Sequence, residues 1–194
     1  MASNMPSKGA KIMTKTKFGE FVEKQNDERI QAEESGRDWA RERDKWLENV
    51  ESFYTTIFSY LREYIDRGQI VVQQAPVTLF EEGVGEYSTK TATLSLGKKQ
   101  IKFEPIGTNL IGAKGRIDMI GPNGKVKFVL VDKAASSPEF VVEISVDGEA
   151  PSKKAQEDVR RECVWKISTP PPRIGYFELN EESFFDAMME VANA

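Results

Sequence analysis

Residues 97–133 decide the fold of this chain, and they read GKKQIKFEPIGTNLIGAKGRIDMIGPNGKVKFVLVDK. Apolar and polar residues alternate in three segments of this stretch, as they do in β-strands that bury one face. Residues 97–99 (Gly-Lys-Lys) and 121–124 (Gly-Pro-Asn-Gly) are typical of hairpin turns. In the second turn, Asn-Gly tolerates the positive φ angles of a tight turn. The strand predicted at 125–131 ends with apolar residues on both faces, which indicates a central place in the sheet.

The same stretch concentrates positive charge. It holds eight basic and three acidic residues, whereas the whole chain of 194 residues has a net charge of −4. A face of the sheet carrying these cations would contact the phosphates of a nucleic acid, and the candidate residues are Lys102, Lys114, Arg116, Lys125 and Lys127. The alternative is internal compensation, because residues 139–194 contain twelve acidic and six basic residues.

The composition excludes several classes of site. The chain has no histidine, so a Ser–His–Asp or Cys–His nucleophile is impossible. The single cysteine, Cys163, cannot form an internal disulfide, and four Cys/His ligands for a structural zinc ion are not present. A hard cation held by carboxylates is compatible with the composition. We expect a soluble, cytoplasmic protein of bacterial style, because the sequence has no long apolar run and no secretory signal.

A strong amphipathic helix precedes the β region. Between Asp38 and Gly68 the apolar positions recur at steps of three and four, so that they form one face of a helix; they include Trp46, Val50, Phe53, Ile57, Leu61 and Tyr64. We expect this face to pack on the sheet.

Upstream, residues 16–36 are mostly charged and suggest a separate helical arm that ends at Ser35-Gly36. Residues 1–15 are expected to be a flexible tail, and residues 16–194 a single domain.

The remaining segments complete an α+β fold. Short strands are expected at 69–73, 77–80, 86–96, 140–146, 165–168 and 174–179, with helices at 151–164 and after the N-cap Asn180. We therefore predict a long N-terminal helix on a mostly antiparallel, twisted sheet of about five to seven strands, with C-terminal helices. The predicted core comprises Val50, Phe53, Ile57, Leu61, Phe103, Ile117, Phe128, Leu130, Val142, Trp165 and Phe184.

Residues 107–114 come close to a phosphate-binding P-loop. That motif needs lysine directly after its second glycine and a helix after it. Here Ala113 separates Gly112 from Lys114, and a strand is predicted next. We interpret the glycines as parts of a turn or a β-bulge.

The order of elements is similar to the core of the PD-(D/E)xK nucleases, and Gly115-Arg116-Ile117-Asp118 resembles the first acidic strand of that family. The resemblance implies an Mg²⁺ or Mn²⁺ site at Asp118 and Glu143, with Lys133 supporting the attacking water. However, Val131 stands where the family has an acid, and the adjacent Asp132 and Lys133 would point to opposite faces. The alternative is a hairpin whose Arg116 and Asp118 form a pair on the solvent face.

Trp39 and Trp46 lie in a charged part of the long helix, where aromatic residues are typical anchors of protein interfaces. The alternative is that both tryptophans pack on the protein's own sheet. Our leading hypothesis is a non-enzymatic interaction or adaptor protein that binds another protein or a second copy of itself, without a cofactor. The second hypothesis is a divergent metal-dependent nuclease or nucleic-acid-binding protein that uses residues 97–133.

Overall fold

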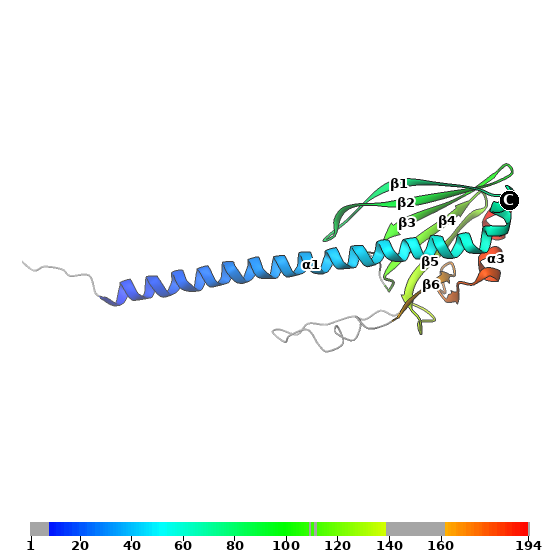
Figure 1. Cartoon of the computed structure of the whole chain (residues 1–194). Helices are drawn as coiled ribbons and strands as arrows, with labels where there is room; N and C mark the ends of the chain where they lie inside the picture. Colours follow the sequence, from blue (N-terminus) through cyan, green and yellow to red (C-terminus); the bar gives the residue numbers. More distant parts are fainter. Residues whose placement is uncertain (1–7, 109, 111, 139–161, 194) are drawn as a thin grey trace, which may run out of the picture. The chain divides into compact units, whose positions relative to one another are not determined.

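A computed structural model describes residues 8–108, 110, 112–138 and 162–193 (Figure 1). The chain divides into two units, Met1–Glu42 and Arg43–Ala194. Helix α1 (Lys8–Asp66) runs through both units, and the second unit contains all the described strands and the last helix. Their bounds are β1 (Val71–Glu81), β2 (Gly85–Leu96), β3 (Lys99–Gly107), β4 (Gly115–Gly121), β5 (Gly124–Asp132), β6 (Cys163–Ser168), β7 (Tyr176–Glu178) and α3 (Glu181–Ala192).

The described strands form one antiparallel sheet in which each strand pairs with the next in sequence order, from β1 to β7. The α+β prediction is therefore confirmed. Turns join β2 to β3 at residues 97–98 and β4 to β5 at residues 122–123, as the sequence predicted. Strand β5 lies between β4 and β6, and its buried residues on both faces reflect that central place.

The hydrophobic core lies where α3 and the C-terminal part of α1 pack on one face of the sheet. Phe53 of α1 is fully buried, with ring centroids 5.0 Å from Phe128 and from Trp165 and 6.1 Å from Phe103. Phe184 of α3 joins the same cluster at 6.3 Å from Phe128. Nearly all the predicted core residues that are described belong to this cluster or pack against it. Leu130 is buried but is not part of the cluster. Val142 lies outside the described residues.

One prediction about the N-terminal region is wrong, because the helix does not break at Ser35-Gly36. The helix begins at Lys8, upstream of residue 16, where the sequence analysis placed its start. A single glycine costs a helix only about 1 kcal/mol relative to alanine. The flanking residues are mostly alanine, glutamate and arginine, which favour helix strongly enough to continue through it.

Strand β1 is also longer than predicted, since it continues through Ala75-Pro76 instead of dividing there. Proline lacks the backbone N–H that forms a ladder hydrogen bond, which a central strand cannot easily lose. Because β1 is an edge strand and pairs only with β2, Pro76 is tolerated within it.

The β1–β2 hairpin changes the face that it buries. In β2 the buried residues near the turn are the odd-numbered Tyr87 and Thr89, whereas further along they are the even-numbered Ala92 and Leu94. Opposite faces of the strand are therefore buried in its two halves. The switch falls where β2 stops pairing with β3, whose described pairs with β2 extend only to Ala92. A two-stranded ribbon twists more strongly than a wide sheet, and this twist explains the change of face.

Helix α3 begins as the sequence predicted. The Asn180 side chain accepts a hydrogen bond from the backbone N–H of Ser183 at 2.9 Å, and the Ser183 hydroxyl accepts one from the backbone N–H of Asn180 at 3.0 Å. This reciprocal arrangement is a capping box. The strand predicted at 140–146 and the helix predicted at 151–164 lie outside the described residues, apart from the exposed Glu162 and the first residues of β6.

We predict that Gly115→Ala destabilises the protein by about 1–3 kcal/mol, because overpacking a core costs this much. A Cβ atom at Gly115 would lie 2.2 Å from Cζ3 of the buried Trp46 ring. Urea denaturation followed by tryptophan fluorescence should show the loss as a lower midpoint. Gly36→Ala is the control, because no atom lies within 4 Å of a Cβ there; an equal loss in both variants would contradict the prediction.

Candidate functional site

Asp118 is the most buried acidic side chain in the described structure. It lies on β4, where Ile117 and Met119 point into the core and Asp118 points to the other face of the sheet. Its side chain is only 3% exposed. The pairing of Arg116 with Asp118 therefore occurs as expected, but the carboxylate is buried instead of facing solvent.

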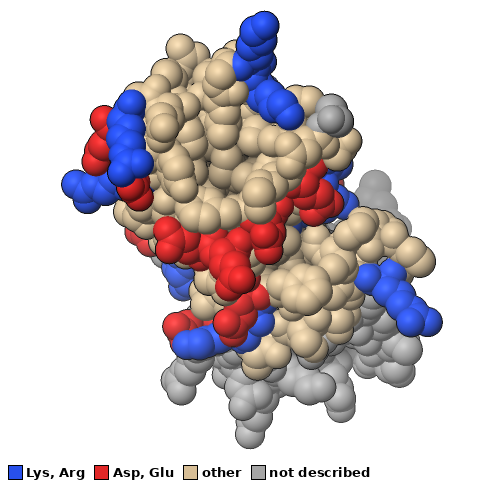
Figure 2. Space-filling view, turned by 90° about the vertical axis from the view of Figure 1, so that its right-hand side faces the viewer, with Lys and Arg blue, Asp and Glu red and all other residues tan. Residues whose placement is uncertain are grey.

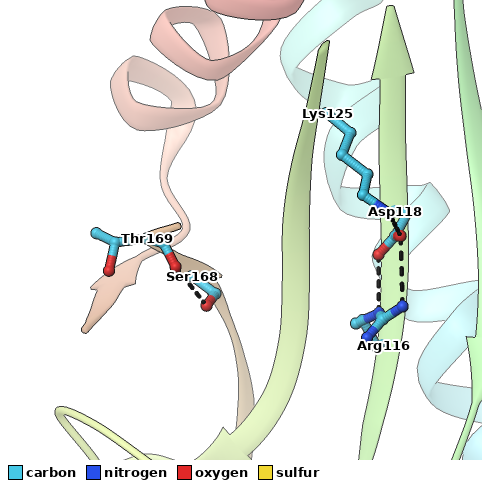
Figure 3. Close-up of polar contacts among 5 residues, drawn as sticks. All are labelled: Arg116, Asp118, Lys125, Ser168 and Thr169. Carbon is cyan, nitrogen blue, oxygen red and sulfur yellow. Dashed lines mark hydrogen bonds and ion pairs between the residues drawn. The ribbon is translucent and has the colours of Figure 1, made fainter. Parts of the chain in front are cut away.

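Two cations neutralise Asp118 (Figure 3). Arg116 Nε lies 2.8 Å from Asp118 Oδ1, and Lys125 Nζ lies 3.1 Å from Oδ2. Both partners are supplied by local structure, because Arg116 is two residues away on the same strand and Lys125 follows the tight β4–β5 turn. The carboxylate is thus held by the protein's own cations.

The residues of the nuclease hypothesis do not come together in the described structure. Asp118 is opposite Lys127 on β5, so Lys133 lies six residues, or about 20 Å, further along the chain. Lys133 instead pairs with Glu162 at 3.0 Å, and Glu143 lies outside the described residues. Among the described residues no three acidic, cysteine or histidine side chains are grouped to hold a metal ion.

The proposed nucleic-acid surface is largely compensated. Lys102, Arg116, Lys125 and Lys127 share the sheet face opposite the core, as the alternation predicted, while Lys114 precedes β4. Lys102 pairs with Glu104 at 2.5 Å, and Arg116 and Lys125 share Asp118. Only part of the predicted positive charge is therefore available to a polyanion.

Acidic side chains share a groove with Lys127, a candidate cation for which no ion pair has been described above. A groove of about 540 Å³ between β5, β6 and α3 is lined by Lys125 and Lys127, but also by Asp186 and Glu190. Figure 2 shows a band of acidic side chains across the end of the second unit where α3 lies. Helix α3 contains four acidic residues and no basic one. A phosphate in this groove would meet carboxylates, so the groove does not favour nucleic acid.

A second buried carboxylate, which the sequence analysis missed, connects the β1–β2 hairpin to the end of β3. Glu81 is 7% exposed and accepts a hydrogen bond from the Tyr87 hydroxyl. It also accepts hydrogen bonds from the Thr108 backbone N–H at 2.6 Å and from Thr108 Oγ1 at 2.9 Å. A Cβ atom at Gly107 would lie 2.6 Å from the Glu81 carboxyl carbon, so only glycine leaves room there.

This contact explains Gly107, the first glycine of the segment that resembles a P-loop. Pairing between β3 and β4 shifts register between Pro105 and Gly107, as expected for a β-bulge. The backbone N–H after Gly107 binds a carboxylate of the protein itself. No local sequence signal marks Glu81, because Tyr87 reaches it across the folded hairpin and Thr108 reaches it from the end of β3.

The two tryptophans have different surroundings. Trp46 is 1% exposed in the core, and its ring centroid lies 6.0 Å from that of Trp165. Trp46 therefore packs on the protein's own sheet, which was the alternative to partner binding, and its ring is not exposed to a partner. Trp39 belongs to the first unit and is half-buried.

Exposed apolar side chains gather near the start of α1. Phe18, Phe21 and Val22 are 66%, 59% and 47% exposed. They occupy one side of the helix, since residues three and four apart are neighbours there. We call these three residues the arm stripe, and the part of α1 within the first unit, Lys8–Glu42, the arm.

Comparison with known proteins gives no relative: no protein-family model, curated protein or solved structure matches this chain. Within the described residues, no helix has both the length and the apolar character needed to cross a membrane.

We predict that Asp118→Asn destabilises the protein by about 1–3 kcal/mol, because Arg116 and Lys125 would lose the anion between them. Asp66→Asn is the control: its pair with Arg62 is exposed, and removal of such pairs costs at most about 1 kcal/mol. Thermal unfolding with and without millimolar MgCl₂ measures both effects. A magnesium-dependent rise in Tm that Asp118→Asn abolishes would instead favour the metal site.

A second prediction concerns alkaline pH. Burial raises the pKa of Tyr87 above its ordinary value of 10.0, and the hydrogen bond to Glu81 and the charge of that carboxylate raise it further. Above pH 10 the unfolded chain loses this proton while the folded protein keeps it, so Tyr87 contributes stability that declines as pH rises through this range.

We therefore expect the stability advantage of the native protein over Tyr87→Phe to shrink above pH 10, by up to about 1.4 kcal/mol per pH unit. Urea titrations of both proteins below and above pH 10 measure this difference. A difference that stays constant across pH 10 would show that Tyr87 ionises equally in both states.

Proposed function

We propose that this protein is a non-enzymatic interaction protein that binds another polypeptide through the arm stripe. The observation that carries the proposal is the exposure of Phe18, Phe21 and Val22 on one side of a described helix. Burial of one such side chain contributes about 1.5–3 kcal/mol. A partner that covers all three would gain a substantial part of its binding energy there.

The spacing of positions along one face of α1 supports this role, although Gln25, Arg29 and Arg43 in the series are polar. Steps of four and three residues run from Phe18 to Ile57, close to the 3.5-residue period that lets one helix pack lengthwise on another surface; the positions are Phe18, Val22, Gln25, Arg29, Ala32, Gly36, Trp39, Arg43, Trp46, Val50, Phe53 and Ile57. In the second unit the sheet covers this series, and Trp46, Val50, Phe53 and Ile57 are buried. In the first unit Phe18 and Val22 are exposed members of the same series.

The arm also has the polar surface of a paired helix. Lys24 and Glu28 form an i, i+4 pair at 3.8 Å, and Arg41 and Asp38 form an i, i+3 pair at 2.5 Å. Such pairs stabilise a helix surface that stays in water. An apolar stripe flanked by charged pairs is typical of helices that associate with one another.

The alternative function, nucleic-acid binding or hydrolysis at residues 97–133, has less support. Three of its five basic residues already form ion pairs with Glu104 or Asp118. We therefore place the interaction on the helix and not on the sheet.

The test is site-specific photo-crosslinking with p-benzoylphenylalanine at Phe21, in cells of the source organism. We expect covalent adducts with a polypeptide, either a second copy or another protein. The same group at Ile30 is the control, because Ile30 is also exposed but lies about 120° around the helix from Phe18. Equal labelling at both positions, or none at Phe21, would overturn the proposal.

A further inference from the structure

We infer that the partner of the arm is the arm of a second copy, antiparallel to it, with the two-fold axis near Phe21 and Val22. The inference rests on the proposed function and specifies its partner. Around this axis, Phe18, Phe21 and Val22 of the two copies would cover one another. Gln25 and Arg29 of the same series would lie toward the ends of the apolar contact, where water reaches them.

The charge distribution of the arm requires the antiparallel direction. Residues 1–19 contain four lysines and no acidic residue, whereas residues 20–42 contain eight acidic and four basic residues. A parallel pair would place the two basic segments together and the two acidic segments together. An antiparallel pair places each basic segment beside an acidic one, and such complementarity selects between binding modes.

The position of the axis follows from the same charges. If Phe21 of one copy is opposite Val22 of the other, paired residue numbers sum to 43. Residues 8–17 of one copy are then opposite residues 26–35 of the other, a segment with four acidic residues and one basic residue. The apolar contact at the centre and the charge contacts on both sides therefore form in one register.

The helix dipole supports this arrangement. The N-terminus of an α-helix carries a partial positive charge, which acidic side chains in the first turn normally offset. The first turn of α1 contains no acidic residue, and lysines follow it. The acidic segment of an antiparallel partner supplies the missing negative charge.

The first experiment is light scattering combined with spin-label distances. We expect a mass of about 44 kDa, twice the 21.9 kDa of the chain. Single nitroxide labels are placed at Gly19→Cys and, separately, at Glu42→Cys, both in a Cys163→Ser background. An antiparallel pair puts the two labels at residue 19 within about 25 Å of each other and those at residue 42 about 60 Å apart, from the helical rise of 1.5 Å per residue.

Each other result overturns the inference in a distinct way. Short distances at both positions would show a parallel pair, and the proposed function would stand. A dimer with long distances at both positions would place the interface outside the arm. A monomer that still gives Phe21 adducts with another protein would retain the function and remove the second copy, whereas a monomer without adducts would remove both.

The second experiment exchanges the charges. Lys15→Glu with Lys17→Glu, and separately Glu28→Lys, should each weaken self-association about tenfold or more by placing like charges opposite each other. A mixture of the two variants should recover the native Kd, because both ends of the mixed pair are complementary again. Failure of the mixture to associate, with each variant still helical by circular dichroism, would contradict the antiparallel register.

Discussion

The packing of Phe53 between α1 and the sheet is the interaction on which the rest of the second unit depends. Its ring contacts residues of β3, β5 and β6, so three strands meet at one helical position. Burial of large aromatic side chains dominates the energy of such interfaces. Because this contact fixes the face of α1 that the sheet covers, it also fixes where Trp46 lies, about two helical turns toward the N-terminus on the same face.

Two buried carboxylates show how the fold treats charge. Asp118 is neutralised by Arg116 and Lys125 from its own hairpin, whereas Glu81 is held by uncharged donors, Tyr87 of its own hairpin and Thr108 after β3. Buried charged groups are tolerated only when they are paired or hydrogen-bonded. Glu81 is hydrogen-bonded, and Asp118 is held by ion pairs, although its Oδ1 accepts no hydrogen bond.

The long helix has one pattern and two environments. The sheet covers the series that runs from Phe18 to Ile57 where it passes through the second unit, whereas its members Phe18 and Val22, with the neighbouring Phe21, are exposed in the first unit. A surface of this kind, beside segments of opposite net charge, combines apolar burial with a preference for direction. This is why the interaction hypothesis moves from Trp39 and Trp46 to the start of α1.

The sequence by itself determined the class of fold, the amphipathic face from Trp46 to Leu61, the hairpin turns and the cap at Asn180, because these depend on residues close together in the chain. It could not determine that β1 continues through Pro76, that β2 changes its buried face, or that Glu81 meets Thr108. These features depend on which strand lies at the edge and on contacts between distant segments. The tertiary structure alone decided that Trp46 is buried while Phe18 is exposed, since only the position of the sheet distinguishes two aromatic residues of the same helical series.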